Sequence, residues 1–229
     1  MKRTNFHALI PDLAEHLGDD HEQGERERHA EAREVLSRLP ALVRAGNAAE
    51  LEARIHAPEL VTLAKTWTWG DGSVLLMGPT RLGKSSAMGY LFRRLLAASV
   101  RSAELWDQAR WMRWFATEEL AGCRKAHRLG QGDPPELIQS CNSRLLFLDD
   151  AGWDSDPLEI SVLLADRYNA CRPSIISTGK TKTELRAHYG AAVVARLLET
   201  GGKGRGRVIN LFPPEPARAP GKTATGREP

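Results

Sequence analysis

The sequence has no long hydrophobic run and few cysteines. No stretch approaches the roughly 18 consecutive apolar residues of a membrane-spanning helix, and the first residues lack the apolar segment of a signal peptide. The three cysteines are an odd number without metal-ligand spacing, and the seven histidines show no such spacing either. These features argue against a disulfide-stapled secreted scaffold and a zinc module. We therefore expect a cytoplasmic protein with reduced thiols and no membrane partner.

The charge balance is nearly even. The formal net charge is +3 over 229 residues, so the overall electrostatics neither require nor exclude a nucleic-acid partner. The hydrophobic content of 41% is enough for a packed core. The length suits one full domain with appendages, and we find no internal repeat.

Residues 78–85 read Gly-Pro-Thr-Arg-Leu-Gly-Lys-Ser, which fits the phosphate-binding loop pattern G-x-x-x-x-G-K-[ST]. An apolar run at 74–77 indicates a strand before the loop, and apolar residues at helical spacing over 85–98 indicate a helix after it. In that setting the backbone N–H groups of the loop and the helix N-terminus surround the β-phosphate. Lys84 reaches the β- and γ-phosphates, and Ser85 is a ligand of Mg²⁺.

The same pattern predicts the residues that contact the nucleotide. We expect ATP to be held by Gly78, Pro79, Thr80, Arg81, Leu82, Gly83, Lys84, Ser85 and Ser86. The alternative is a glycine turn with a solvated lysine, which the strand–loop–helix context makes the weaker interpretation.

A second run, at 144–149, is apolar and ends in Asp149 and Asp150. A strand that is apolar on both faces is typical of the centre of a parallel sheet. Ligands of α/β proteins bind at the carboxyl ends of such strands, so both acids are expected beside the phosphate loop. We assign Asp149 to the Mg²⁺ shell and Asp150 to polarising the attacking water. The alternative is an ordinary strand end with an acidic turn.

Strands and helices alternate along the chain, which predicts an α/β fold with a parallel sheet. We expect further strands at 103–106, 173–177 and 208–212, and helices at 107–129, 160–168 and 191–198, with a capping box opening another helix at Thr181. The predicted organisation has three parts. Residues 1–66 form a helical, partly disordered partner-docking region, residues 67–212 form the core, and residues 213–229 form a disordered tail.

The segment 107–129 carries Arg110, Trp111, Arg113 and Trp114, followed by further basic residues. Aromatic and basic residues interleaved in this way can bind single-stranded nucleic acid. The interpretation we favour is an amphipathic helix with tryptophans in the core and a solvated basic face. A basic loop at 203–207 either contacts phosphates or is a simple hairpin.

Taken together, these motifs resemble the AAA+ ATPases of the DnaC/IstB type, which are helicase loaders and transposition helper ATPases. The resemblance covers about residues 67–212. It rests on the phosphate loop, on the strand ending in Asp-Asp-Ala-Gly at 149–152, and on two more specific segments. Residues 166–178 are similar to an Arg-Tyr helix leading into Arg-Pro-Thr-Ile-Ile-Thr-Ser, and residues 194–197 are similar to the segment that carries a trans-acting arginine.

The resemblance implies a function and several roles. It implies an ATPase with Mg²⁺ that associates head-to-tail, binds single- or double-stranded DNA, and loads or remodels a replicative helicase or a transposase. Arg196 corresponds to the trans-acting arginine. The sequence has Gly179 where the family has a polar sensor, so Thr178 or Ser177 would take that role.

Two other functions remain open. The missing sensor side chain, and Arg81-Leu82 in place of the family's Gly-Thr pair, favour slow hydrolysis and allow a nucleotide-gated adaptor with little turnover. A small phosphate-loop kinase is less well supported, because kinases usually place the loop near the chain start and carry an arginine-rich lid.

Overall fold

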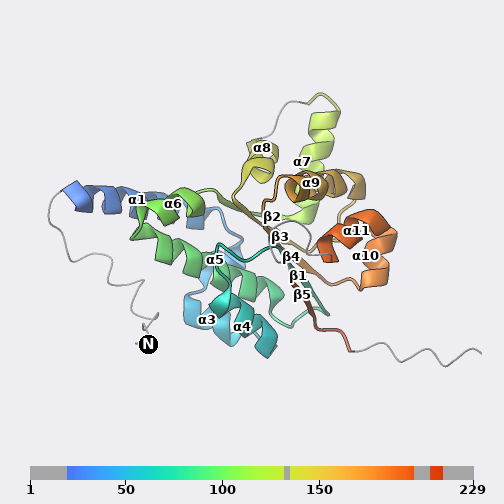
Figure 1. The fold of residues 1–229 in the computed structure, drawn as a ribbon, viewed down its shortest axis with the longest axis horizontal. Helices are drawn as coiled ribbons and strands as arrows, with labels where there is room; N and C mark the ends of the chain where they lie inside the picture. The colour runs from blue at the N-terminus through green and yellow to red at the C-terminus, as the bar shows by residue number, and fades with distance from the viewer. Residues whose placement is uncertain (1–19, 132–134, 199–206, 214–229) are drawn as a thin grey trace, which may run out of the picture.

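A central parallel sheet organises the molecule (Figure 1). The computed structural model describes residues 20–131, 135–198 and 207–213. The five strands are β1 (Val74–Met77), β2 (Met112–Ala116), β3 (Leu145–Asp149), β4 (Ser174–Thr178) and β5 (Arg207–Asn210). They lie in the order β2-β3-β4-β1-β5, and every pairing is parallel. The predicted α/β fold, a parallel sheet flanked by helices, is confirmed.

Helices cover both faces of this sheet (Figure 1). On one side lie α1 (Asp20–Ser37), α2 (Ala41–Ala45), α3 (Ala48–Ala53), α4 (Pro58–Thr66), α5 (Lys84–Val100) and α6 (Ala103–Ala109). The other side carries α7 (Thr117–Arg128), α9 (Pro157–Asn169), α10 (Lys182–Tyr189) and α11 (Ala191–Leu198), with α8 (Pro135–Asn142) beside β2. No helix among the described residues is both long and apolar enough to cross a bilayer.

Local sequence signals explain where several helices begin. The predicted capping box is present at α10, where Thr181 and Glu184 satisfy each other's backbone N–H groups. The Asn47 side chain accepts a hydrogen bond from the Glu50 N–H, 2.9 Å away, and so caps α3. Pro157 begins α9 at a position where no backbone N–H donor is needed.

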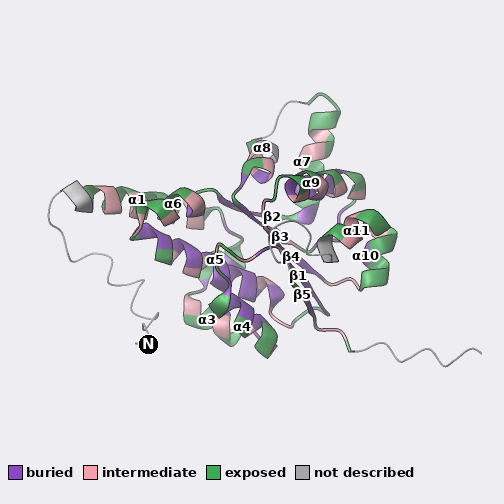
Figure 2. Cartoon of the chain, in the orientation of Figure 1, coloured by how far each residue is buried: buried purple, intermediate pink, exposed green. Residues whose placement is uncertain are grey.

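The alternation of side chains along the strands produces two hydrophobic cores. Val74 and Leu76 of β1 pack with α1–α6, whereas Leu75 and Met77 pack with α7 and α9–α11. Successive side chains of a strand point to opposite faces, so an all-apolar strand serves both layers. Figure 2 shows the resulting purple sheet between helices whose outer surfaces are green.

The helices before β1 share the core of the sheet. Val43, Leu51, Leu60 and Leu63 from α2–α4 are almost fully buried, and they belong to the same cluster as the inner face of α5. A Cβ at Gly89 of α5 would lie 2.7 Å from a methyl carbon of Val43, so the helices meet closely there. The partner-docking role of residues 1–66 stays a prediction, and α2–α4 are also part of the packed domain.

One predicted region was wrong. The expected strand at 103–106 is helix α6, and the expected helix at 107–129 is divided into strand β2 and helix α7. Met112 and Trp114 face the α5 side of the sheet, and Trp114 stacks on Phe147 of β3 with parallel rings 5.6 Å apart. Met112 and Trp114 therefore follow the two-residue period of a strand, and Trp111 precedes the strand. Trp114 is in the core, as the favoured interpretation held, while Trp111 is 44% exposed.

A buried arginine joins β4 to α8. Arg167 of α9 is 2% exposed and donates hydrogen bonds to the Ser174 hydroxyl, the Ser143 hydroxyl and the carbonyl oxygens of Ser140, Ser143 and Pro173, at 2.6–3.0 Å. Burial lowers its pKa to about 9, with a smaller effect of the Arg172 charge. It therefore remains charged at neutral pH, and its hydrogen bonds tie together three elements.

Several predictions fall on residues outside the described part of the chain. They are the disordered tail over 214–229, the basic loop at 203–206 and the first 19 residues of the docking region.

Candidate nucleotide-binding site

The loop predicted to bind phosphate connects β1 to α5 at the carboxyl end of the sheet. Its first residue, Gly78, donates its N–H to the Thr178 carbonyl of β4, 3.3 Å away. Its last glycine, Gly83, caps α5 in the left-handed conformation, with φ of 85°. A Cβ at Gly83 would lie 2.2 Å from the Arg54 carbonyl oxygen, so a side chain is excluded by backbone strain and by contact. The glycine fixes the loop against the chain that leaves α3.

Arg81 supplies the curl that the family's additional glycine would supply. Its φ is 70°, in the left-handed region that non-glycine residues rarely adopt. Such a conformation costs about 1–2 kcal/mol, and the Arg81 side chain is exposed. The departure from the family pattern therefore does not prevent the loop from closing, but it leaves strain in it.

Lys84 is the first residue of α5 and is 7% exposed. Its ammonium group donates hydrogen bonds to the carbonyl oxygens of Gly78 and Pro79, both 2.7 Å away. Burial lowers the pKa of Lys84, and the nearby charges of Asp150 and Asp149 oppose that effect. The lysine is thus held across the mouth of the loop, where a phosphate would bring it a stronger anionic acceptor.

Ser85, Asp149 and Ser177 form a polar cluster beside the loop. The Ser85 hydroxyl donates to Oδ1 of Asp149 at 3.0 Å, and the Ser177 hydroxyl donates to the same oxygen. Burial is the main cause that raises the pKa of Asp149. The hydrogen bonds from Ser177 and Ser85 lower this pKa, whereas the charge of Asp150 raises it. The structure therefore brings together the two residues that the sequence predicted as Mg²⁺ ligands.

The donor set fits Mg²⁺ bound together with a nucleotide. Among the described residues there is no group of three or more His, Cys, Asp or Glu side chains that could hold a metal. Mg²⁺ commonly uses one or two protein oxygens and completes its shell with water and substrate phosphates. A hydroxyl and a carboxylate oxygen 3.0 Å apart, next to a phosphate loop, match that arrangement.

Asp150 turns away from the strand. Its φ is 58°, and its backbone N–H donates to the Ser177 hydroxyl at 3.1 Å, while the side chain is exposed. The chain therefore bends at Asp150 itself. This bend frees the Asp150 carboxylate from the alternation of the strand and leaves it open to solvent beside Asp149.

The two candidates for the polar sensor differ in their contacts. The Thr178 hydroxyl is fully buried, donates to the Ala151 carbonyl at 2.6 Å and accepts the Lys180 N–H at 3.0 Å. The Ser177 hydroxyl instead contacts the Asp149 carboxylate and the Asp150 backbone. Thr178 holds the turn, and Ser177 is the hydroxyl that reaches the acids.

Sequence reasoning missed two groups that support the site. The Thr117 hydroxyl, at the start of α7, donates to the Asp149 carbonyl at 2.6 Å. Asp154 accepts the Gly152 N–H at 3.2 Å and the Tyr189 hydroxyl, so it anchors the turn after Asp150 to α10. Neither residue belongs to a motif, since each acts through hydrogen bonds to residues that the sequence motifs do not link to it.

Arg196 lies at the end of the sheet opposite the phosphate loop, where β1 and β4 begin. It is exposed, its guanidinium lies 5.8 Å from the centre of the Tyr168 ring, and it borders a small cavity with Ser73 and Ser174. Those two serines stand where β1 and β4 begin, whereas the phosphate loop follows the end of β1. The structure therefore does not bring Arg196 to the phosphate loop of its own chain.

The fold was compared with solved structures. The sequence matches no protein-family model, and a search of curated proteins finds no match. Similar solved structures include the DnaC helicase loader, with 20% identity, a TM-score of 0.44, and coverage of 72% of this chain and 92% of that chain.

Two further structures show a comparable likeness. A putative primosome component from Streptococcus pyogenes serotype M3 has 17% identity and a TM-score of 0.48, over 79% of this chain and 96% of that one. AMPPCP-bound DnaA from Aquifex aeolicus has 15% identity and a TM-score of 0.47, over 77% of this chain and 49% of that one.

Proposed function

We propose that this chain is an ATPase that binds ATP–Mg²⁺ at residues 78–86 and uses nucleotide-dependent assembly to load or remodel a replicative helicase or a transposase on DNA. The observation that carries the proposal is the convergence of Lys84, Ser85 and Asp149 at one end of the sheet. Phosphate contacts, a Mg²⁺ ligand pair and an exposed second carboxylate are the parts that phosphoryl transfer to water requires.

Each residue has a distinct role in this mechanism. Lys84 would neutralise the β- and γ-phosphates of ATP, and Ser85 and Asp149 would hold Mg²⁺. Asp150 accepts a proton from, or orients, the water that attacks the γ-phosphate. Ser177 positions Asp149 and the Asp150 backbone through its single hydroxyl. Mg²⁺ supplies charge stabilisation of the transferring phosphoryl group.

The position of Arg196 supports the proposed assembly. Arg196 lies near the amino ends of the strands, and its own phosphate loop lies at their carboxyl ends. It can therefore act on a γ-phosphate only in a neighbouring copy. Such a contact is head-to-tail, and head-to-tail contacts produce rings or open helical assemblies instead of closed two-fold dimers. A DNA- or helicase-bound assembly of this kind is the form in which we expect hydrolysis.

Binding and hydrolysis are tested separately. Lys84→Ala removes the phosphate contact and should lower ATP affinity at least about 100-fold, the effect of about 2.7 kcal/mol, while exposed Lys125→Ala serves as the matched control. Asp150→Asn should retain ATP and stop turnover. Unchanged ATP affinity in Lys84→Ala, measured by calorimetry, would show that the loop does not bind phosphate.

A mixing experiment tests the role in trans. Arg196→Ala protein has an intact nucleotide site, and Lys84→Ala protein has an intact arginine, so a mixture should regain hydrolysis that neither variant has alone. The assay contains single-stranded DNA and the helicase candidate at concentrations where the wild type assembles. Activity that stays absent in the mixture argues against a trans-acting arginine.

Removing residues 1–19 leaves every described element in place and tests partner delivery.

A second candidate is a nucleotide-gated adaptor. The observation that favours it is the absence of a side chain at Gly179, together with the engagement of the Thr178 hydroxyl inside the turn. An adaptor would bind ATP and ADP with different partner affinities and show no turnover with DNA, helicase or transposase present. The same turnover assay therefore separates the two functions.

A further inference from the structure

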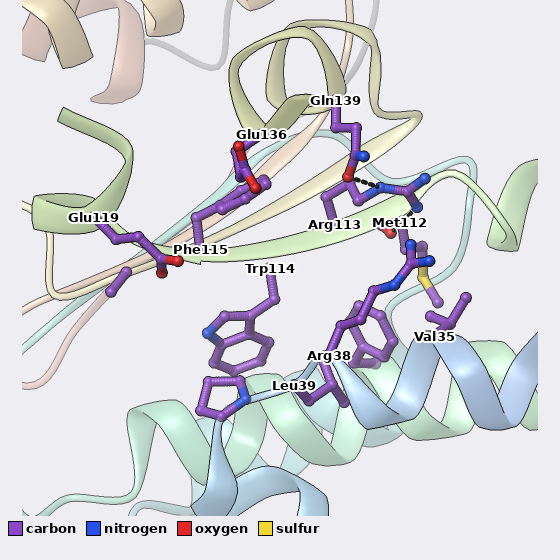
Figure 3. A pocket seen from close by; sticks show the side chains of 13 residues that line it. Val35, Arg38, Leu39, Met112, Arg113, Trp114, Phe115, Glu119, Glu136 and Gln139 are labelled. Atoms are coloured by element: carbon purple, nitrogen blue, oxygen red, sulfur yellow. Dashed lines mark hydrogen bonds between the residues drawn. The ribbon is translucent and has the colours of Figure 1, made fainter. Parts of the chain in front are cut away.

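A large groove lies on the side of the sheet remote from β5. It encloses about 610 Å³ and is bordered by α1, β2, α7 and α8 (Figure 3). That volume is in the range of sites that bind small molecules or short peptide segments. The groove takes no part in the nucleotide site, whose residues do not line it.

The lining shows that the groove follows the edge of β2. All five residues of the strand, from Met112 to Ala116, border it. Successive side chains of a strand point to opposite faces, so a groove on one face would be lined by every second residue. In the described part of the chain, β2 ends the sheet and pairs with β3 on its other side. The groove therefore opens onto an unpaired strand edge, which is a template for another strand.

Trp114, one of the residues that line the groove, carries an unpartnered donor. Trp114 is 8% exposed, and its ring is fixed by stacking on Phe147. Its indole Nε1 is buried and has no hydrogen-bond partner among the described residues. The N–H groups of Trp67 and Trp106, by contrast, donate to the Gly72 carbonyl and the Glu31 carboxylate. Burying an unpaired donor costs free energy. A bound segment that brings a hydrogen-bond acceptor to the Trp114 N–H would therefore be stabilised.

The two ends of the groove carry opposite charges. Figure 3 shows Arg38 and Arg113 together near Met112, while Glu119 and Glu136 lie toward Phe115. Burial lowers the pKa of the Arg113 guanidinium, and the charge of Arg38 lowers it further. Arg38 is ion-paired with the exposed Glu34 carboxylate, so an acidic group from a partner would compete with Glu34 at Arg38 and would be attracted by both guanidinium groups.

The present partners of Arg113 are neutral. Its guanidinium donates to the Gln139 side chain at 3.0 Å and to the carbonyl oxygens of Arg110 and Met112 at 2.8 and 2.7 Å. A carboxylate makes a stronger hydrogen bond with a guanidinium than these acceptors do. An acidic side chain in the groove would therefore displace Arg113 from the Met112 carbonyl, which lies in the edge strand.

The geometry points to a docking groove for an extended peptide segment of a partner protein, which adds to β2 as a sixth strand and carries an acidic residue at one end and a basic residue at the other. The acidic residue faces Arg38 and Arg113, and the basic residue faces Glu119 and Glu136. Backbone hydrogen bonds along the edge supply affinity, and the charged ends fix register and direction. This inference does not depend on nucleotide binding.

The test uses capped synthetic peptides of roughly seven residues, the length of an ordinary strand. One has a glutamate near its N-terminus and a lysine near its C-terminus, separated by valine and threonine, and a second has the charges exchanged, so both strand directions are covered. Acetyl and amide caps remove terminal charges. A third peptide has glutamine at both charged positions, and a fourth has proline at its centre.

Two readouts report on the groove itself. NMR follows the indole N–H signals of the six tryptophans, of which Trp114 should shift, while Trp67 serves as an internal reference. Hydrogen exchange should show slower exchange of the outward N–H groups of β2 when a charged peptide is bound. The neutral peptide should bind at least about tenfold more weakly, and the proline peptide should give no protection.

Variants assign the charged ends. Arg38→Glu and Glu119→Gln should each weaken the favoured peptide several-fold, and their matched controls are Arg110→Glu and Glu104→Gln, outside the groove. The indole spectrum of each free variant checks that it is folded. The inference is overturned if no charged peptide at about 1 mM shifts Trp114, or if binding leaves the β2 amides unprotected. It is also overturned if free glutamate or sulfate gives the same shift, because the site would then take a small anion.

Discussion

Leu51→Ala tests whether α2–α4 belong to the packed domain or form a detachable appendage. Leu51 is 0% exposed and packs in the cluster shared by α3 and α5. Removing a fully buried leucine side chain costs about 2–5 kcal/mol, the loss of apolar burial plus the cavity left behind. For a domain of this size each kcal/mol lowers the melting temperature by roughly 2–4 °C, so a shift of roughly 4–20 °C is expected.

The matched control is Leu42→Ala in α2, because Leu42 is 50% exposed and the same atoms are removed. That variant should change the free energy of unfolding by less than about 0.5 kcal/mol. Urea unfolding followed by circular dichroism and by tryptophan fluorescence gives both the stability and the cooperativity. Equal stabilities of the two variants, or a separate early transition in Leu51→Ala, would refute the view that these helices and the sheet form one cooperative unit.

Three further predictions concern single residues. Arg81→Gly should relieve the left-handed strain at this position. The free energy of unfolding should rise by about 0.5–1 kcal/mol, net of the chain entropy that glycine adds to the unfolded state. Arg81→Ala should give no such rise, and equal melting temperatures of the two variants would contradict the prediction. Since burial raises the pKa of Asp149, its ionised form destabilises the folded state, so Asp149→Asn should melt above wild type at pH 7 and converge with it toward about pH 4. Arg167→Met removes five charge-assisted hydrogen bonds to oxygen atoms, at about 1.5–3 kcal/mol each, and urea unfolding should show a loss above about 3 kcal/mol that Arg167→Lys partly recovers.

The candidate nucleotide site was predictable because its chemistry is concentrated in two short segments. The loop at 78–85 and the acids at 149–150 each follow a run of apolar residues, and parallel strands place their carboxyl ends at one edge. The sequence therefore predicted that Ser85 and Asp149 would be close, and they are 3.0 Å apart. The bend at Asp150 was not predictable, because aspartate adopts a left-handed conformation only where its surroundings require it.

The segment 103–129 shows where sequence reasoning failed. Residues 110–114 read Arg-Trp-Met-Arg-Trp, and their tryptophans are spaced three apart, as on a helix. In the fold, Met112 and Trp114 share one face of β2 because the strand packs against β3. A five-residue run of mixed polarity carries too little periodicity to distinguish the two structures. Tertiary packing decided between them.

The contacts of Gly83 join two features that the sequence analysis kept apart. The chain leaving α3 places the Arg54 carbonyl against Gly83, and the His56 N–H donates to the Leu82 carbonyl at 3.2 Å. The helices before the sheet therefore hold the phosphate loop from outside, in addition to packing on α5. A displacement of these helices would be transmitted to the phosphate loop through these two backbone contacts. Under the proposed function, these two backbone contacts connect a partner docked on α2–α4 to the phosphate loop.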